Sequence, residues 1–132
     1  MRKRHSWKID RNSIVPIPSI VSMLNLIIEV VCKKSDGVLI QTPIYPPFFE
    51  AIKRQKRKLL NNRLVYKNGK YSIDFDDFEK KAKEAKLFLL CSPHNPTGRV
   101  WSEDKFCYAK KSIRDCDTAD KKRIVMFRKV DI

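Results

Sequence analysis

The feature that most constrains the fold is an uninterrupted apolar run, Leu87 to Cys91, which ends in a loop rich in proline and glycine. Because this run does not alternate between apolar and polar residues, we expect a strand that is covered on both faces. In open α/β sheets, ligands bind just beyond the carboxyl ends of such strands. The loop that carries Asn95 is therefore a candidate binding site, although the same residues also suit a plain polar connection.

A second segment nearer the N-terminus has the same character. The strand-like run Val38 to Gln41 also ends in prolines, and Tyr45 lies between them. Two such strands, each followed by a rigid loop, favour an α/β layer.

Helical patterns alternate with these strands. Apolar residues recur at helical spacing from Ile20 to Cys32, and Ser19 is a suitable N-cap. Further helices are predicted over Pro46 to Lys56 and, with Asp74 as the cap, over Phe75 to Ala85. This alternation predicts a mainly parallel sheet with helices packed on it.

The remaining segments are a hairpin and a weakly patterned tail. Lys58 to Tyr66 is predicted to be a strand, and Asn68-Gly69 gives a tight turn because both residues tolerate positive φ. Ser102 caps a short helix, after which Cys107 to Arg123 is charged and poorly patterned. A last strand is predicted over Ile124 to Val130.

Three longer segments, in this order and at this spacing, resemble a known family. They are Gly37-Val-Leu-Ile-Gln-Thr-Pro-Ile-Tyr-Pro-Pro-Phe-Phe-Glu-Ala-Ile52, Asn68-Gly-Lys-Tyr-Ser-Ile-Asp-Phe-Asp-Asp-Phe-Glu79 and Leu87-Phe-Leu-Leu-Cys-Ser-Pro-His-Asn-Pro-Thr-Gly-Arg-Val-Trp101. The chain resembles the pyridoxal 5'-phosphate (PLP) enzymes of the aspartate aminotransferase fold, fold type I, and within it the cystathionine β-lyase-like carbon-sulfur lyases. The resemblance runs from Arg4 to Lys105 and covers a minor part of a typical enzyme of that family.

The resemblance implies a partial PLP-transferase large domain over residues 1–105, α/β with a mainly parallel sheet and incomplete at both ends, followed by a divergent or truncated tail over residues 106–132. It implies PLP as the cofactor, a small amino acid as the substrate and a homodimer in the intact family. The implied reaction is elimination that cleaves the carbon-sulfur bond of a sulfur amino acid. An aminotransferase is the alternative, because both reactions begin with the same carbanion.

The resemblance also assigns cofactor-binding residues. Tyr45 aligns with the residue that covers the cofactor ring, and Asn95 with the one that hydrogen-bonds the O3′ oxygen. The phosphate would lie at Ser19 and Ile20, where the backbone N–H groups of a helix start favour an anion. Relatives commonly have glycine at the position of Ser19, and a helix cap without a ligand explains this serine equally well.

No catalytic residue is assigned. After Lys105 neither the lysine that would hold PLP nor the aspartate that would face the pyridine nitrogen is readable, so we expect the chain to be inactive alone. Another reading is a subunit that is completed by a second chain carrying the lysine.

The net charge of +14 raises the question of a nucleic-acid partner. The basic residues are spread along the chain without a reader motif, so we disfavour nucleic acid and expect a solvated, lysine-rich surface. A small basic nucleic-acid-binding module derived from this fold remains the alternative from another class.

The cysteines and histidines suggest no metal site. The four cysteines contain no Cys-x-x-Cys pair, which favours free thiols and a cytoplasmic location. We expect Cys91 to be a core thiol, His94 a polar loop residue and Trp101 a packing residue. No apolar run is long enough for a membrane span.

Overall fold

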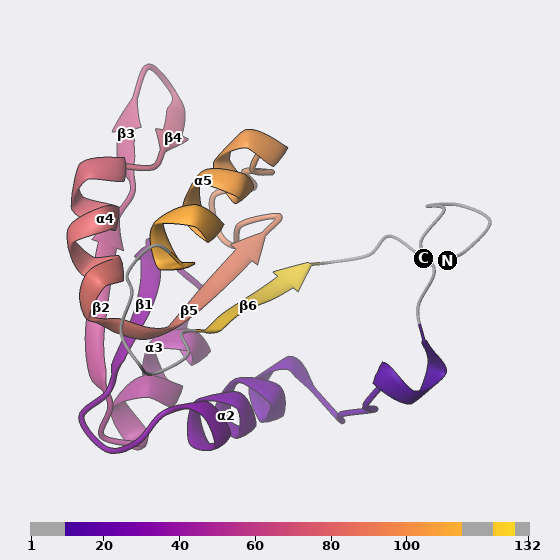
Figure 1. Cartoon of the computed structure of the whole chain (residues 1–132). Coiled ribbons are helices and arrows are strands. Elements are labelled where there is room, and N and C mark those ends of the chain that lie inside the picture. Colours follow the sequence, from indigo (N-terminus) through magenta and orange to yellow (C-terminus); the bar gives the residue numbers. More distant parts are fainter. Residues whose placement is uncertain (1–9, 115–122, 129–132) are drawn as a thin grey trace.

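The computed structural model describes residues 10–114 and 123–128, and its centre is a parallel sheet with helices on both faces (Figure 1). The strand order is β2-β1-β5-β6, and every neighbouring pair is parallel. The strands are β1 (Gly37–Thr42), β2 (Lys58–Arg63), β5 (Ala85–Ser92) and β6 (Arg123–Arg128). The prediction of an α/β fold with a mainly parallel sheet is confirmed.

Two layers of helices enclose the sheet. The short 3-10 helix η1 (Arg11–Ser13) precedes them. Helices α2 (Ile20–Val31) and α3 (Pro46–Arg54) pack on one face, and α4 (Phe75–Glu84) and α5 (Glu103–Arg114) pack on the other. The strands therefore contribute side chains to two separate hydrophobic cores, one on each face of the sheet. Successive side chains of one strand alternate between these cores. One core contains Val38, Ile40, Leu87 and Leu89, and the other contains Leu39, Phe88 and Leu90.

The helix caps lie where the sequence places them. The Ser19 hydroxyl oxygen accepts a hydrogen bond from the Ser22 N–H at 3.1 Å, and the Asp74 carboxylate accepts one from the Asp77 N–H at 3.0 Å. The helix that was predicted to end at Lys56 instead ends at Arg54, and the other two end within a residue of their predicted ends.

The predicted strand over Lys58 to Tyr66 is interrupted. Strand β2 ends at Arg63, the Leu64 side chain enters the core beneath α4, and β3 (Val65–Lys67) then pairs antiparallel with β4 (Lys70–Ser72). The predicted turn between these two strands is confirmed, with φ of 51° at Asn68 and 73° at Gly69.

Helix α5 corrects one prediction. The segment after Cys107 was expected to be poorly patterned, yet α5 continues to Arg114. The Tyr108 ring packs edge-on against Phe75 with ring centroids 4.5 Å apart, and its hydroxyl donates to the Glu79 carboxylate. These contacts with α4 hold the helix in place. Because they join residues far apart in the sequence, the residue pattern within α5 does not predict them.

Strand β6 confirms the prediction of a last strand. It pairs with β5 from Arg123 to Arg128, whereas the last residues of the predicted strand lie outside the described part of the chain.

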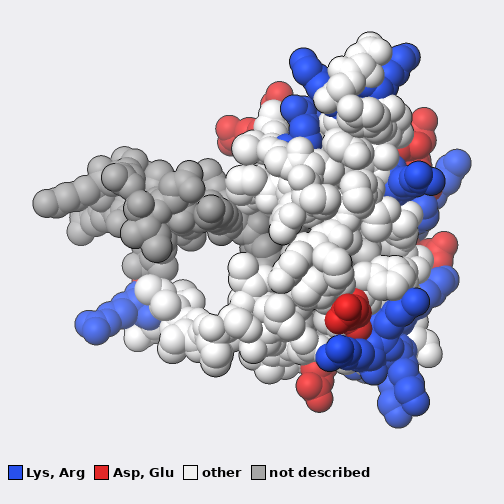
Figure 2. Space-filling model, turned by 180° about the vertical axis from the view of Figure 1, so that it is seen from behind, with Lys and Arg blue, Asp and Glu red and all other residues white. Residues whose placement is uncertain are grey.

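Charge is distributed unevenly over the surface. Figure 2 shows a face whose middle is largely uncharged, while lysines and arginines gather toward its margins. Among the described residues, no helix is long and apolar enough to cross a membrane.

Candidate functional site

The two proline-rich loops meet at the carboxyl edge of the sheet. Because β1 has β2 on one side and β5 on the other, the strand order reverses at this point, and ligands bind at such switch points in open α/β sheets. Tyr45 lies after β1 and is the N-cap residue of α3, whereas Asn95 lies after β5. The Tyr45 N–H donates to the Asn95 carbonyl oxygen at 3.0 Å, so the two loops are joined directly.

Two of the predicted cofactor residues present unused groups. The Tyr45 side chain is 41% exposed, and Asn95 is also exposed. Neither side chain has a hydrogen-bond partner within the described part of the chain. The geometry thus leaves an aromatic face and an amide available on neighbouring loops.

The other two predicted residues lie at the start of α2. The Ser19 hydroxyl is occupied by the cap and also lies 2.9 Å from the Ser22 hydroxyl. The backbone N–H of Ile20 has no partner among the described residues, as expected for the first turn of a helix. Figure 1 shows that α2 begins on the side to which β5 and β6 point, but no hydrogen bond in residues 10–114 joins this helix start to the Tyr45 and Asn95 loops.

These residues fit PLP in their chemistry. An exposed aromatic ring suits the flat pyridine, a free amide suits O3′, and the free N–H at a helix start suits a phosphate. Ser19 has φ −157° and ψ 162°, an extended conformation that serine adopts without strain. The replacement of the usual glycine therefore does not distort the helix start, although the serine hydroxyl is already engaged.

His94 is a polar loop residue, as predicted, and it is buried, with only 1% of its surface exposed. Its Nε2 lies 3.2 Å from the Gln41 carbonyl oxygen and its Nδ1 lies 3.1 Å from the Thr97 hydroxyl. Burial lowers the pKa of His94 and outweighs the opposing effect of the Gln41 carbonyl. The local sequence does not predict this burial. The position of His94 next to Asn95 is the one feature that draws attention to it.

The neighbours of His94 have the predicted structural roles. The Trp101 indole N–H donates to the Cys91 carbonyl oxygen at 3.2 Å, and its buried ring meets the His94 ring at a centroid distance of 5.8 Å. Cys91 is buried, and desolvation raises the pKa of its thiol. The packing role of Trp101 and the core role of Cys91 are confirmed.

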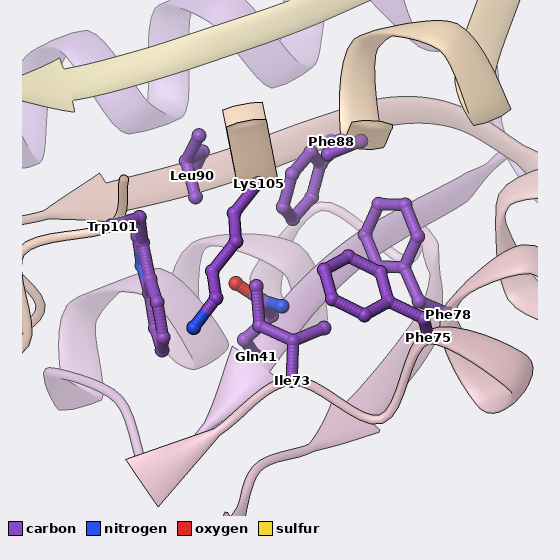
Figure 3. A pocket seen from close by; sticks show the side chains of 9 residues that line it. Gln41, Ile73, Phe75, Phe78, Phe88, Leu90, Trp101 and Lys105 are labelled. Carbon is purple, nitrogen blue, oxygen red and sulfur yellow. The ribbon is translucent and has the colours of Figure 1, made fainter. Parts of the chain in front are cut away.

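A small cavity beneath Trp101 lies on the face of the sheet that α4 and α5 cover (Figure 3). Its volume is about 10 Å³, which is too small for a cofactor. The buried Gln41 side chain points into it and donates to the Asn62 amide oxygen at 3.1 Å, and the Lys105 Nζ lies 5.6 Å from the centre of the Trp101 ring. Asn62 donates in turn to the Asp77 carboxylate at 2.7 Å. Sequence reasoning missed this polar connection.

A larger open groove of about 960 Å³ lies at the ends of β1 and β2. Thr42, Arg63 and Tyr66 are among its lining residues. None of the four predicted cofactor residues lines it.

The chain belongs to the aminotransferase class I and II family, because the model of that family matches residues 1–114. It is similar to cystathionine beta-lyase PatB of Bacillus subtilis, with 40% identity over 106 residues that are 79% of this chain and 27% of PatB. It is also similar to histidinol-phosphate aminotransferase of Methanocorpusculum labreanum, with 33% identity over 59% of this chain and 21% of that protein.

Solved structures extend this likeness to the fold. Cystalysin from Treponema denticola, whose crystal structure contains PLP, matches with a TM-score of 0.85 and 37% identity over 97% of this chain and 32% of that chain. The PLP-bound C-S lyase from Staphylococcus hominis matches with a TM-score of 0.84 and 32% identity over 96% of this chain and 32% of that chain. This chain thus spans less than a third of the length of these proteins.

The elements after Asn95 have the order that the resemblance implies, but β6 lacks the implied aspartate. The resemblance implies a helix and then a strand with an aspartate, and α5 and β6 occur in that order. The residues of β6 are Arg123-Ile-Val-Met-Phe-Arg128, which include no acid. This strand therefore supplies no carboxylate to a pyridine nitrogen.

Proposed function

We propose that this chain is a fragment of a PLP-dependent carbon-sulfur lyase of the cystathionine β-lyase type, and that it forms one wall of the cofactor site without being active alone. The observation that carries the proposal is the Tyr45–Asn95 backbone hydrogen bond, because it sets an exposed ring and a free amide side by side at the switch point of the sheet. The lyase relatives PatB, cystalysin and the Staphylococcus enzyme support this class.

The residues of this chain would bind and orient the cofactor. Tyr45 would cover one face of its ring and exclude water there, Asn95 would donate to O3′, and the N–H groups at Ser19 and Ile20 would hold the phosphate. When bound, PLP supplies the electron sink for reactions at the α-carbon of an amino acid.

The chain alone lacks a readable group for the proton transfers. The half-buried side chain of Lys105, the first lysine after Asn95, packs over the Trp101 ring and lines the small cavity there. We therefore propose that no pyruvate is released from cystathionine by this chain.

An aminotransferase is the second candidate. The family model and the histidinol-phosphate aminotransferase relative favour it. The residues described here bind the part of the cofactor that both reactions share, so they do not separate the two activities.

Partners and location follow from the family and from composition. We propose a small amino acid as the substrate and a homodimer for the intact protein. The described cysteines Cys32, Cys91 and Cys107 are free, which supports the cytoplasmic location. We do not propose a nucleic-acid partner, because the basic residues are spread along the chain without a reader motif.

The test is binding of pyridoxamine 5′-phosphate, which cannot form Schiff bases with the many surface lysines. We expect binding to the wild-type chain and at least a several-fold loss in Tyr45→Ala and Asn95→Ala. Tyr66→Ala is the control, because this exposed tyrosine lines the open groove at the ends of β1 and β2, which none of the four predicted cofactor residues lines. Equal affinity in all four proteins would contradict the proposal.

Borohydride reduction after addition of PLP tests the missing lysine. We expect diffuse labelling of many lysines, because none is held against the cofactor. One stoichiometrically labelled lysine together with pyruvate release from cystathionine would show that the chain is catalytic.

A further inference from the structure

The buried imidazole of His94 has a partner at each nitrogen. A carbonyl oxygen only accepts hydrogen bonds, so the nitrogen that faces Gln41 at 3.2 Å, Nε2, must carry the proton. In the neutral ring Nδ1 is then an acceptor, and the Thr97 hydroxyl at 3.1 Å donates to it. The surroundings therefore select one tautomer.

This ring lies between the two loops of the candidate site. Gln41 belongs to β1, whose end leads to Tyr45, and His94 directly precedes Asn95. The ring bond to Gln41 and the Tyr45–Asn95 backbone bond at 3.0 Å both join the segment after β5 to the segment at the end of β1. Two connections prevent a relative rotation that one connection would permit.

The His94 turn is also fixed internally. The His94 N–H donates to the Arg99 carbonyl oxygen at 2.7 Å, and the Gly98 N–H donates to the His94 carbonyl oxygen at 2.6 Å. The Trp101 ring packs against the imidazole from the side. A shift of the imidazole would thus move the whole turn that carries Asn95.

We propose that His94 is a positioning residue that fastens the Asn95 loop to the end of β1 through its Nε2–H tautomer. The inference rests on the proposed function, because it concerns the placement of the amide assigned to O3′. It gives His94 no part in proton transfer or metal binding, since both ring nitrogens are used within the protein.

The first test needs no cofactor. In the full chain labelled with ¹⁵N, we expect the His94 ring to show one neutral tautomer with the proton on Nε2. A mixture of tautomers, or a proton on Nδ1, would overturn the proposal.

The second test is hydrogen exchange of the Tyr45 amide. In His94→Leu we expect exchange at least 10-fold faster than in the wild type, with β2 amides as the internal reference. In His94→Gln we expect protection close to wild type, because the glutamine Nε2 can replace the imidazole donor. Equal exchange in all three proteins would refute the role, as would equal loss in the two variants with β2 protection retained.

Thr97→Val serves if His94→Leu does not fold. It removes the donor to Nδ1 with little change in shape, and we expect the proton to stay on Nε2, because the Gln41 carbonyl oxygen still faces that nitrogen. A proton on Nδ1, or a mixture of tautomers, in Thr97→Val would mean that the Gln41 carbonyl does not fix the ring and would overturn the proposal.

The binding of pyridoxamine 5′-phosphate then separates the two proposals. If the wild type binds, we expect affinity to fall in His94→Leu and to recover in His94→Gln. If the wild type does not bind, the proposed function fails, while the tautomer and exchange results still decide the role of His94.

Discussion

Helices α2 and α4 cover opposite faces of the same sheet, but they differ in the polarity of the side chains that they expose to solvent. Helix α4 buries Phe78 and Ala82 and carries charge outside, with a Lys81–Asp77 pair at 2.6 Å. Helix α2 buries Leu24 and Ile28, yet its outer side also exposes several apolar side chains. The exposed apolar side chains there are Ile20 at 58%, Val21 at 40%, Leu26 at 49% and Val30 at 73%.

The difference shows which of the two helix layers has an outer surface suited to solvent. Acidic residues in the first turn of α4 and lysines in its last turn complement the helix dipole, as in an ordinary surface helix. Helix α2 has Glu29 as its only charged residue, and apart from Ser22, Asn25 and Glu29 all its side chains are apolar, which is more than an ordinary surface helix carries. The outer side of α2 is therefore suited to burial against another surface.

The largest expected effect is association through α2. We expect the chain to be marginally stable, to bind a hydrophobic dye, and to aggregate unless a partner covers it, because apolar faces and strand edges are uncovered. The double substitution Leu26→Lys and Val30→Lys should reduce both dye binding and light scattering.

The matched control lies on α4. Lys80→Gln on the exposed side of that helix should leave dye binding and scattering unchanged. A monomeric wild-type chain with a cooperative thermal transition above about 60 °C would contradict the expectation.

The next effect is in the core beneath α4. Phe78 is fully buried and packs edge-on against Phe88 at 5.1 Å, so Phe78→Ala should lower the free energy of unfolding by about 3–5 kcal/mol. Ile20→Ala at the exposed start of α2 should change it by about 0.5 kcal/mol or less. Urea denaturation measures both, and equal losses would mean that the outer side of α2 is already covered.

The caps should contribute equally to the two helices. Ser19→Ala and Asp74→Ala each remove a hydrogen bond to a first-turn N–H, and each should cost about 1 kcal/mol of unfolding free energy. Ser19→Gly should cost only a few tenths of a kcal/mol. If the proposed phosphate site is real, Ser19→Gly should also bind pyridoxamine 5′-phosphate more tightly, whereas Asp74→Gly should not.

The smallest expected effect is the loss of stability at low pH that comes from Asp77 in α4. Burial opposes the shift, but hydrogen bonds from Lys81 and Asn62 hold the pKa of Asp77 below its ordinary value of 3.8. Its contribution to stability is complete above that value and is lost as the pH falls through the lower pKa of the folded state. Asp77→Asn should remove this part of the pH dependence in urea titrations, while Glu29→Gln on α2 should leave it unchanged.

The sequence predicted the elements whose signals are local. The unalternating runs of β1 and β5 identified strands covered on both faces, and Ser19 and Asp74 marked helix starts. It did not predict the buried polar contacts of His94 and Gln41, because burial of a polar side chain depends on which carbonyl or amide a distant strand places beside it. Helix α5 was underestimated for the same reason, since Tyr108 finds its partners on α4.

The central place of β1 has a consequence for how the chain folds. Its neighbour β2 follows after one helix, whereas its other neighbour β5 comes much later in the chain. During synthesis from the N-terminus, the β1–α3–β2 unit can form while β5 is still inside the ribosome. The contact between Tyr45 and Asn95 joins residues far apart in the sequence. It therefore carries the entropy cost of closing a long loop, and it forms only after β5 has been synthesised. We therefore expect the ligand-facing edge to be the last part of this domain to acquire its native shape.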